Sequence, residues 1–293
     1  MPITIKRLSH ALGAEICGLD LRDEIDAAAM AEILTAWREH QVLLFRDQDL
    51  TEEDQVRFTR KFGPLEKRPR KTELLADATA TKYPGYTMLI SNIRQDGKLI
   101  GSLPDGEVHF HSDASFSETP PSGTFLYAIE VPEVGGETVL ANMYAVWEAL
   151  PEETRQRVSD KTALNVYMLG ACVRDEHIPD LSADPNYTHP IMRTHPETGR
   201  DLLYVNRLCT WQLNGFEAEE GETLRDELFD HTEQAQFHYA HKWRKGDLLL
   251  WDNRCTQHAR NDFSNSERRL LRRVVVESDD VPSNRYLRGA ATV

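Results

Sequence analysis

The sequence predicts a mainly β fold, a β-sandwich or open barrel that also carries helices. Many short segments have strand composition and are separated by clear turn signals, at Pro120–Gly123 and at Gly135–Gly136. A helical and loop-rich section at about 145–235 is interpreted as an insert in a β core at roughly 85–280. Because barrels and sandwiches of this size often stay undivided, the whole chain, 1–293, is expected to be one domain.

The first 65 residues predict an α+β segment ahead of the core. Apolar residues recur at helical spacing over Asp26–His40, and the apolar run Gln41–Phe45 that follows is typical of a buried strand. Thr51 with Asp54 resembles a capping box, so a second helix is expected to begin there and to run to about Phe62. Further short strands are expected at Ile3–Leu8 and Ala14–Ile16.

The rest of the chain is predicted to alternate strands with helices. Strands are expected at Leu89–Ile93, Phe110–Phe116, Gly123–Ile129, Thr138–Asn142, Leu202–Val205, Phe237–Trp243, Asp247–Trp251, Cys255–Ala259 and Arg269–Glu277. Helices are expected at Ala145–Ser159 and Glu217–Gln236, and the proline-rich residues 170–200 are expected to be loops. The basic cluster Lys67, Arg68, Arg70 and Lys71 is interpreted as a solvated loop or, alternatively, as part of a mobile substrate lid.

The charge balance argues against two classes of partner. The chain has 34 basic and 48 acidic side chains, a net charge of −14, whereas nucleic acids and anionic membranes favour a basic surface. Apolar runs are too short to span a bilayer, and the N-terminus lacks the apolar stretch of a signal peptide. The 4 cysteines are widely spaced, without a C-x-x-C pair. A cytoplasmic protein with reduced thiols and a small-molecule partner is therefore expected.

Two histidines and one carboxylate indicate a metal site. Residues two positions apart on a strand project from the same face, so His111 and Asp113 could contact one ion, which His258 would reach from another strand. This donor set is typical of non-haem Fe(II) sites with positions open for oxygen chemistry, whereas a closed zinc site takes four ligands. His109 shares the predicted face and is a competing ligand; it is interpreted as lying at the pocket mouth, or else as a structural histidine. Cys255, at an odd offset from His258, is not expected to be a ligand.

Alternation along residues 269–276 places two arginines on one face. Arg269 and Arg273 would project together with Leu271 and Val275. Unpaired buried charge is costly, so these arginines need anionic partners, and a guanidinium can hold a carboxylate through two parallel hydrogen bonds. The spacing therefore predicts two anion sites, one for a 2-oxo acid cosubstrate and one for a substrate.

Taken together, the motifs are similar to those of one enzyme family over nearly the whole length. The chain resembles the taurine/2,4-dichlorophenoxyacetate dioxygenase (TauD/TfdA) family of Fe(II)- and 2-oxoglutarate-dependent enzymes. The segments that carry the resemblance are Ala11–Ile16, Val42–Gln48, Phe62–Leu65, Phe110–Phe116, Gly135–Thr138, Arg193–Pro196, Gly246–Asp247 and Trp251–His258.

The resemblance implies a double-stranded β-helix (jelly roll) and a set of site residues. It implies that His111, Asp113 and His258 bind Fe(II). It further implies that Arg269, helped by the Thr138 hydroxyl, binds the distal carboxylate of 2-oxoglutarate, and that Arg273 binds the anionic group of the primary substrate. His109 and Phe116 are further candidates for the substrate pocket, and an aromatic such as Phe116 would favour an aryloxyalkanoate over a sulfonate.

The resemblance also implies a reaction. A small organic anion, namely a carboxylate, sulfonate or sulfate ester, would be hydroxylated with O2 while 2-oxoglutarate is converted to succinate and CO2. Where the attacked carbon bears oxygen or sulfonate, the product would then be cleaved. A homo-oligomer is expected, because multimers are common in the family.

Two other interpretations stay open. A divalent-metal hydrolase could use the same histidines and carboxylate, but it would not need 2-oxoglutarate and would leave Arg269 and Thr138 without a function. A non-catalytic jelly-roll protein that binds a small anion would keep ligand binding after the loss of His111 or Asp113.

Overall fold

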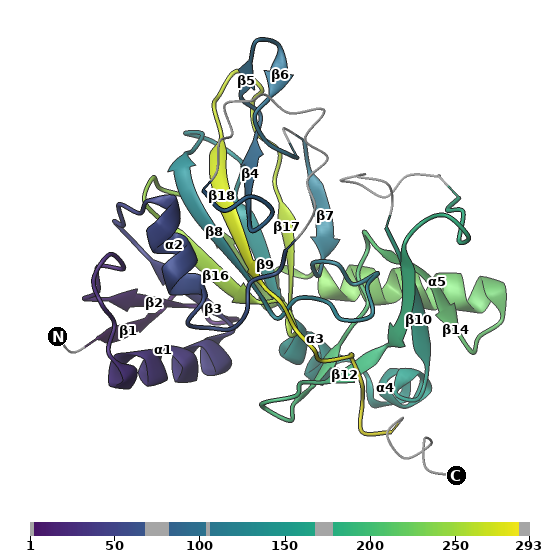
Figure 1. Ribbon diagram of the computed structural model, residues 1–293. Helices are drawn as coiled ribbons and strands as arrows, with labels where there is room; N and C mark the ends of the chain where they lie inside the picture. Colours follow the sequence, from purple (N-terminus) through teal and green to yellow (C-terminus); the bar gives the residue numbers. More distant parts are fainter. Residues whose placement is uncertain (1–2, 68–81, 104–105, 168–177, 287–293) are drawn as a thin grey trace.

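A seven-stranded sheet forms the main layer of the protein (Figure 1), in a computed structural model that describes residues 3–67, 82–103, 106–167 and 178–286. Its strands are β1 (Thr4–Arg7), β2 (Ala14–Cys17), β3 (Val42–Phe45), β16 (Leu248–Asp252), β8 (Gly123–Glu130), β18 (Leu270–Val276) and β4 (Thr87–Ser91), in that order across the sheet. β2 and β3 are parallel, and the other neighbouring pairs are antiparallel. The N-terminal segment thus extends the core sheet at the edge next to β16.

A four-stranded antiparallel sheet packs against the larger one. Its order is β15 (His238–His241), β9 (Thr138–Asn142), β17 (Thr256–Arg260) and β7 (Val108–His111). Leu126 and Leu249 of the larger sheet share one buried cluster with Leu140 of the smaller sheet. The inner faces of the two sheets therefore enclose the cavity that the predicted metal-binding and anion-binding residues line.

The residues between β9 and β15 form a separate layer with its own core, on the right in Figure 1. This layer contains the helices α3 (Met143–Ala149), α4 (Glu152–Val158) and α5 (Ala218–Thr232), the sheet β11 (Asn186–Pro190), β10 (Thr162–Val166) and β14 (Thr210–Asn214), and the pair β12 (Met192–Thr194) and β13 (Asp201–Leu203). Tyr144, Leu203 and Phe229 are buried at its centre. A short hairpin, β5 (Arg94–Gln95) with β6 (Lys98–Leu99), extends from the top of the molecule as drawn in Figure 1.

Two N-terminal helices cover the outer face of the larger sheet. α1 (Ala27–His40) is capped by the Asp26 side chain and ends where Gln41 takes a left-handed conformation, with φ 67°. α2 (Glu52–Thr59) begins with the capping box that the sequence indicates, because Thr51 and Asp54 each accept a hydrogen bond from the other's backbone amide. The Phe58 ring of α2 packs on the rings of Phe45 and Phe125 in the sheet, and Trp37 of α1 belongs to the same buried cluster.

The prediction of a mainly β fold with helices is confirmed, but several elements differ from expectation. The helix predicted over Ala145–Ser159 is two helices, because Pro151 disfavours the helical conformation at Leu150, which is extended. The strands β10 and β14 were not anticipated, and β11 and β12 lie in a region expected to be loops. These strands are short and obtain their stability from pairing with distant segments, which a local pattern does not show.

The strand predicted over Phe110–Phe116 is wrong in its second half. β7 ends at His111, and the chain then turns through Asp113 with Ala114 in the left-handed region, at φ 52°. Serine and aspartate around this position favour turns because their side chains bond to nearby backbone groups. In the basic cluster, Arg68, Arg70 and Lys71 lie outside the described residues, while Lys67 lies over the Tyr86 ring.

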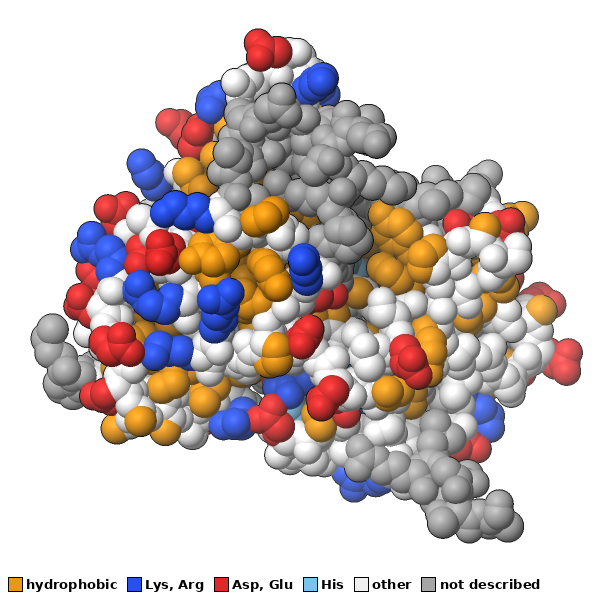
Figure 2. Space-filling model, in the orientation of Figure 1, with side chains coloured by type: hydrophobic (Ala, Val, Ile, Leu, Met, Phe, Trp, Pro, Cys, Tyr) orange, Lys and Arg blue, Asp and Glu red, His pale blue; other side chains and the backbone are white. Residues whose placement is uncertain are grey.

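Charges of both signs intermingle over the N-terminal part of the face shown in Figure 2. Acidic and basic side chains alternate at short range on this part of the face. Surface ion pairs such as Arg22–Asp20 occur in the N-terminal segment. Each helix in the described part of the chain is too short or too polar to cross a bilayer.

The aromatic cluster under α2 provides a test of how the N-terminal segment is held. Phe58 is 1% exposed, and its ring contacts those of Phe45 and Phe62 at centroid distances of 5.3 and 5.4 Å. Phe58→Ala is expected to lower the free energy of unfolding by about 3–5 kcal/mol in urea titrations, because it leaves a cavity in a packed core. Val134→Ala, at a side chain that is 74% exposed, is the control and should change stability by less than about 0.5 kcal/mol. A loss below about 1 kcal/mol for Phe58→Ala would show that the cluster adds little.

Candidate metal and anion site

His111, Asp113 and His258 come together at one end of the smaller sheet. His111 is the last residue of β7 and lies directly opposite His258 of β17 in the antiparallel register. Their ring centroids are 4.1 Å apart, and His111 Nε2 is 3.9 Å from Asp113 Oδ1. One ligand atom from each of the three residues lies within 4.8 Å of the others. The structure thus gathers the three predicted ligands.

Asp113 reaches this position by a route that the strand pattern did not predict. It lies in the turn after β7 rather than on the strand, so the argument from alternating strand faces does not apply to it. The turn, with its left-handed Ala114, brings the carboxylate back toward His111. Oδ2 accepts a hydrogen bond of 2.6 Å from the Thr124 hydroxyl and lies 2.7 Å from Arg273 Nη2. Oδ1 is the oxygen that faces His111.

The expected position of His109 is altered by an irregularity in β7. His258 pairs with His111, but Arg260 pairs with Val108, so β7 has one more residue than β17 over this stretch. As a result Val108 and His111 both line the cavity, and His109 is not among its lining residues. The His109 carbonyl instead accepts a hydrogen bond of 2.8 Å from His111 Nδ1. This bond selects the tautomer of His111 that leaves an Nε2 lone pair toward Asp113.

Phe116 lies in the same turn as Asp113, and its ring packs on Tyr167 at a centroid distance of 4.9 Å. It is not among the residues that line the cavity. The structure therefore places the two further substrate-pocket candidates, His109 and Phe116, beside the cavity and not in its described wall.

The protonation states suit metal binding. Burial lowers the pKa of both imidazoles, that of His258 to about 3, so both are neutral at neutral pH. Burial alone would raise the pKa of Asp113, but the charge of Arg273, with smaller contributions from the histidines, holds it well below its usual range. His258 Nδ1 is buried and has no hydrogen-bond partner among the described residues. Two neutral imidazoles and one ionised carboxylate are what a divalent ion requires of its ligands.

The other end of the same cavity carries a guanidinium that has no counter-charge in the part of the chain that the structure describes. Arg269 comes immediately before β18 and is 2% exposed, and its Nε and Nη1 atoms lack hydrogen-bond partners among the described residues. Its guanidinium lies 5.8 Å from the Phe263 ring centroid. Burial, together with the neighbouring Arg260, lowers the pKa of Arg269 to about 9. An anion at this position would restore both the hydrogen bonds and the charge balance.

Thr138, the first residue of β9, lines the cavity together with Arg269. Its Oγ1 accepts a hydrogen bond of 3.1 Å from the Trp243 indole N–H. Because that bond uses the oxygen as an acceptor, the hydroxyl proton of Thr138 is left to donate to a ligand. The two residues predicted to bind one carboxylate thus both present donors at the same end of the cavity.

Sequence reasoning missed several residues that support the site. Thr124 on β8 and Asn253 after β16 hold Asp113, and Trp243 orients Thr138. Asn253 belongs to the motif Trp251–His258 but offered no local signal, because its partner is distant in the sequence. Thr124 lies in a strand whose composition alone gave no reason to single it out.

Two imidazoles and a carboxylate beside an anion site are typical of non-haem oxygenases. The chain matches the model of the Taurine catabolism dioxygenase TauD, TfdA family over residues 4–275, and it belongs to this family.

Relatives of known name cover nearly the whole chain. This chain is 32% identical to the alpha-ketoglutarate-dependent 2,4-dichlorophenoxyacetate dioxygenase of Cupriavidus pinatubonensis, and the match covers 96% of this chain and 100% of that protein. It is 27% identical to the alpha-ketoglutarate-dependent sulfate ester dioxygenase of Pseudomonas putida, over 95% of this chain and 91% of that protein. The prediction that the chain is an enzyme of the 2-oxoglutarate-dependent dioxygenase class is confirmed by the family and these relatives.

Solved structures agree with this classification. A taurine dioxygenase from Burkholderia xenovorans superposes with a TM-score of 0.80 at 27% identity, covering 97% of this chain and 92% of the other. A structure of AAD-2 in complex with Mn(II) and N-oxalylglycine superposes with a TM-score of 0.78 at 28% identity, covering 97% of this chain and 100% of the other.

A buried histidine behind the Asp113 turn gives a prediction about acid stability. His189 of β11 donates a hydrogen bond of 2.8 Å from Nε2 to the Ser117 carbonyl, and burial lowers its pKa to about 4. Since the unfolded chain binds a proton near pH 6.5 and the folded chain only near pH 4, stability falls as the pH drops between these values. His189→Gln, which can still donate to Ser117 but cannot titrate, should reduce this acid-induced loss by about 2–3 kcal/mol.

The measurement is urea unfolding of both proteins at about pH 7 and about pH 4.5, the range over which the linkage acts. Equal losses of unfolding free energy in the two proteins over this range would show that His189 is not a source of acid sensitivity.

Proposed function

We propose that this chain is an Fe(II)- and 2-oxoglutarate-dependent dioxygenase that hydroxylates a small organic anion, such as a carboxylate, sulfonate or sulfate ester. One observation carries the proposal. The buried guanidinium of Arg269, whose Nε and Nη1 atoms lack hydrogen-bond partners among the described residues, lines the same cavity as the cluster of His111, Asp113 and His258. A hydrolase with the same cluster would have no use for that arginine.

Fe(II) fits the donor set. Two neutral imidazoles and one carboxylate leave coordination positions open, and the unpartnered Nδ1 of His258 is consistent with a missing partner in the cluster. When bound, Fe(II) together with 2-oxoglutarate and O2 supplies the oxidising chemistry, with succinate and CO2 as products of the cosubstrate. The resident side chains hold, orient and shield the reacting groups.

Arg269 and Thr138 would bind the distal carboxylate of 2-oxoglutarate. Between these two residues and the cluster of His111, Asp113 and His258, the cavity wall includes apolar side chains such as Leu126 and Trp251. Such a wall suits the methylene carbons of the cosubstrate and excludes water from the charged groups at both ends. In water-poor surroundings the Arg269–carboxylate contact is stronger than it would be at the surface.

Arg273 would fix the anionic group of the primary substrate close to the metal. One of its nitrogens already lies 2.7 Å from Asp113 Oδ2, so its guanidinium is held by the metal-binding cluster itself. A substrate anion on the remaining N–H groups would place the adjacent carbon near the reacting centre. Where that carbon bears oxygen or sulfur, hydroxylation would lead to cleavage of the product. The relatives named for 2,4-dichlorophenoxyacetate and for sulfate esters support this class of anion.

The two facing sheets fit a double-stranded β-helix. The strands β15, β9, β17 and β7 would form one side, and β16, β8, β18 and β4 the other. In this proposal residues 1–293 are one catalytic domain, and the section at about 145–235 is an insert that packs against the end of the barrel where Asp113 lies.

The proposal is tested by anaerobic titration of the metal-free protein with Fe(II) and 2-oxoglutarate, followed by visible absorption. We expect a charge-transfer band that requires both components, because the cosubstrate would chelate the iron. Absence of the band in folded, iron-loaded protein would contradict the proposal and favour a hydrolase or an anion-binding protein.

Asp113→Ala is expected to abolish the band and succinate formation while the protein stays folded, because the cluster loses its only carboxylate. Asp184→Ala is a matched control, since Asp184 and Asp113 are both 8% exposed and Asp184 is not among the cavity-lining residues. Near-normal succinate production by the Asp113 variant would refute the assignment of this ligand.

The two arginines are expected to have separable roles. Arg269→Ala should weaken 2-oxoglutarate binding to the metal-loaded protein by roughly 100-fold, since a buried charged hydrogen-bond pair contributes about 3 kcal/mol. Arg273→Ala should weaken it by less than about 10-fold while impairing turnover of the primary substrate. Metal content is measured in both variants, because Arg273 contacts Asp113. The reverse order of cosubstrate affinities would mean that the two roles are exchanged.

A further inference from the structure

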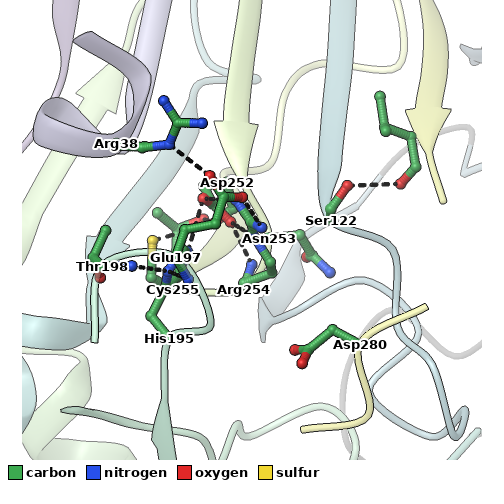
Figure 3. Close-up of polar contacts among 12 residues, drawn as sticks. Arg38, Ser122, His195, Glu197, Thr198, Asp252, Asn253, Arg254, Cys255 and Asp280 are labelled. Atoms are coloured by element: carbon green, nitrogen blue, oxygen red, sulfur yellow. Dashed lines mark hydrogen bonds and ion pairs between the residues drawn. The ribbon is translucent and has the colours of Figure 1, made fainter. Parts of the chain in front are cut away.

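A second group of possible metal ligands lies behind the site and is drawn in Figure 3. His195, Asp252 and Cys255 are buried, and one ligand atom from each lies within 4.8 Å of the others. His195 Nδ1 accepts hydrogen bonds from the backbone amides of Glu197 and Thr198, and Nε2 bonds to Asp252 Oδ2 at 3.1 Å. Both ring nitrogens are therefore in use, which leaves the imidazole without a lone pair for a metal.

The positive charge beside Asp252 is supplied by an arginine. Arg254 Nε bonds to Asp252 Oδ1 at 2.8 Å and Nη2 to Oδ2 at 2.7 Å, so the carboxylate is fully paired. Glu197 extends the network, because its carboxylate bonds to Arg254 on one side and to Arg38 of α1 on the other (Figure 3). The group is thus a closed network of ion pairs that fixes the chain directly after β16.

Asn253 lies between the two residues that this network holds. Its side chain is 0% exposed and makes three hydrogen bonds. Oδ1 accepts from the Asp113 backbone N–H at 2.7 Å, and Nδ2 donates to the Asp113 carbonyl at 3.0 Å and to the Pro121 carbonyl at 2.9 Å. One amide therefore bonds to both peptide groups of the same residue, as a neighbouring strand would.

We propose that Asn253 is a positioning residue that fixes the backbone of Asp113 for metal binding, with the Asp252–Arg254 network as its anchor. The inference rests on the proposed function, in which Asp113 binds the metal. Its physical basis is the turn after β7. Ala114 is left-handed, a conformation that a non-glycine residue keeps only when its surroundings hold it there. Asn253 provides that constraint from outside the turn.

This role differs from those of the other residues around Asp113. Thr124 and Arg273 contact the carboxylate oxygens and so orient the side chain. At Asp113, Asn253 contacts only the backbone N–H and carbonyl, and so fixes the position of the backbone from which the Asp113 side chain extends. Partners that orient a metal ligand commonly change metal affinity by about 10- to 100-fold when they are removed.

The test is the affinity of the full-length protein for Mn(II), measured by calorimetric titration without 2-oxoglutarate. Asn253→Ala is expected to weaken Mn(II) binding by about 10- to 100-fold. Asn165→Ala is the matched control: Asn165 is also 0% exposed, and its side chain bonds to Ala163 and Thr210 in the other core. We expect Asn165→Ala to lower thermal stability by about as much as Asn253→Ala does. Its Mn(II) affinity should stay within about two-fold of the wild-type value, because Asn165 shares no partners with the metal site.

Asn253→Ser is measured in parallel. The serine side chain is too short to bond to both peptide groups of Asp113, but it is small and polar enough to fit in the space that the asparagine leaves. The same loss of affinity in this variant supports the proposal. Wild-type affinity in either folded Asn253 variant, or an equal loss in Asn165→Ala, would overturn it while leaving the proposed function intact. Failure of the wild-type protein to bind Mn(II) would instead refute the metal site, and with it both proposals.

Discussion

The pairing of β17 with its two neighbours is the contact on which the geometry of the site depends. On one side β17 pairs with β7, which places His258 opposite His111. On the other side it pairs with β9, which places Arg260 opposite Thr138. A single strand thus sets the separation between the His111–His258 pair and the part of the cavity that Thr138 lines. A shift of register by one residue would turn every one of these side chains to the other face.

The cavity is also constrained by its charges. Three arginines, Arg260, Arg269 and Arg273, line it together with one carboxylate, Asp113, in surroundings where unpaired charge is costly. Arg273 has a partner in Asp113, whereas Arg269 does not have one for its guanidinium among the described residues. Among the described residues, the guanidinium of Arg269 is therefore left without a counter-charge in this cavity. This imbalance favours a dianionic cosubstrate, with one carboxylate at each end, over a neutral ligand of the same shape.

Much of this site could be read from the sequence, because its residues follow simple periodicities. Arg269 and Arg273 both line the cavity, as the spacing predicted, although Arg269 lies just before β18, and the histidines lie on strands that the sequence pattern located. The turn at Asp113 could not be predicted in this way. It is held by Asn253, 140 residues further along the chain, and local patterns contain no information about such a contact. The bulge that moves His109 away from the cavity likewise arises from pairing with a distant strand.

The hydrogen bond from Trp243 to Thr138 has a consequence for ligand selection. The Trp243 indole occupies one of the two lone pairs of the Thr138 hydroxyl oxygen, so the hydroxyl can still donate its proton and accept through its second lone pair, whereas Arg269 can only donate. This end of the cavity therefore offers several donors against one remaining acceptor on these two side chains. A ligand that ended in an amide would bring two N–H groups to that one lone pair, and the cost of leaving an N–H group unpaired would act against it. Discrimination between an acid and its amide is thus strengthened by one hydrogen bond, formed by a tryptophan that need not touch the ligand.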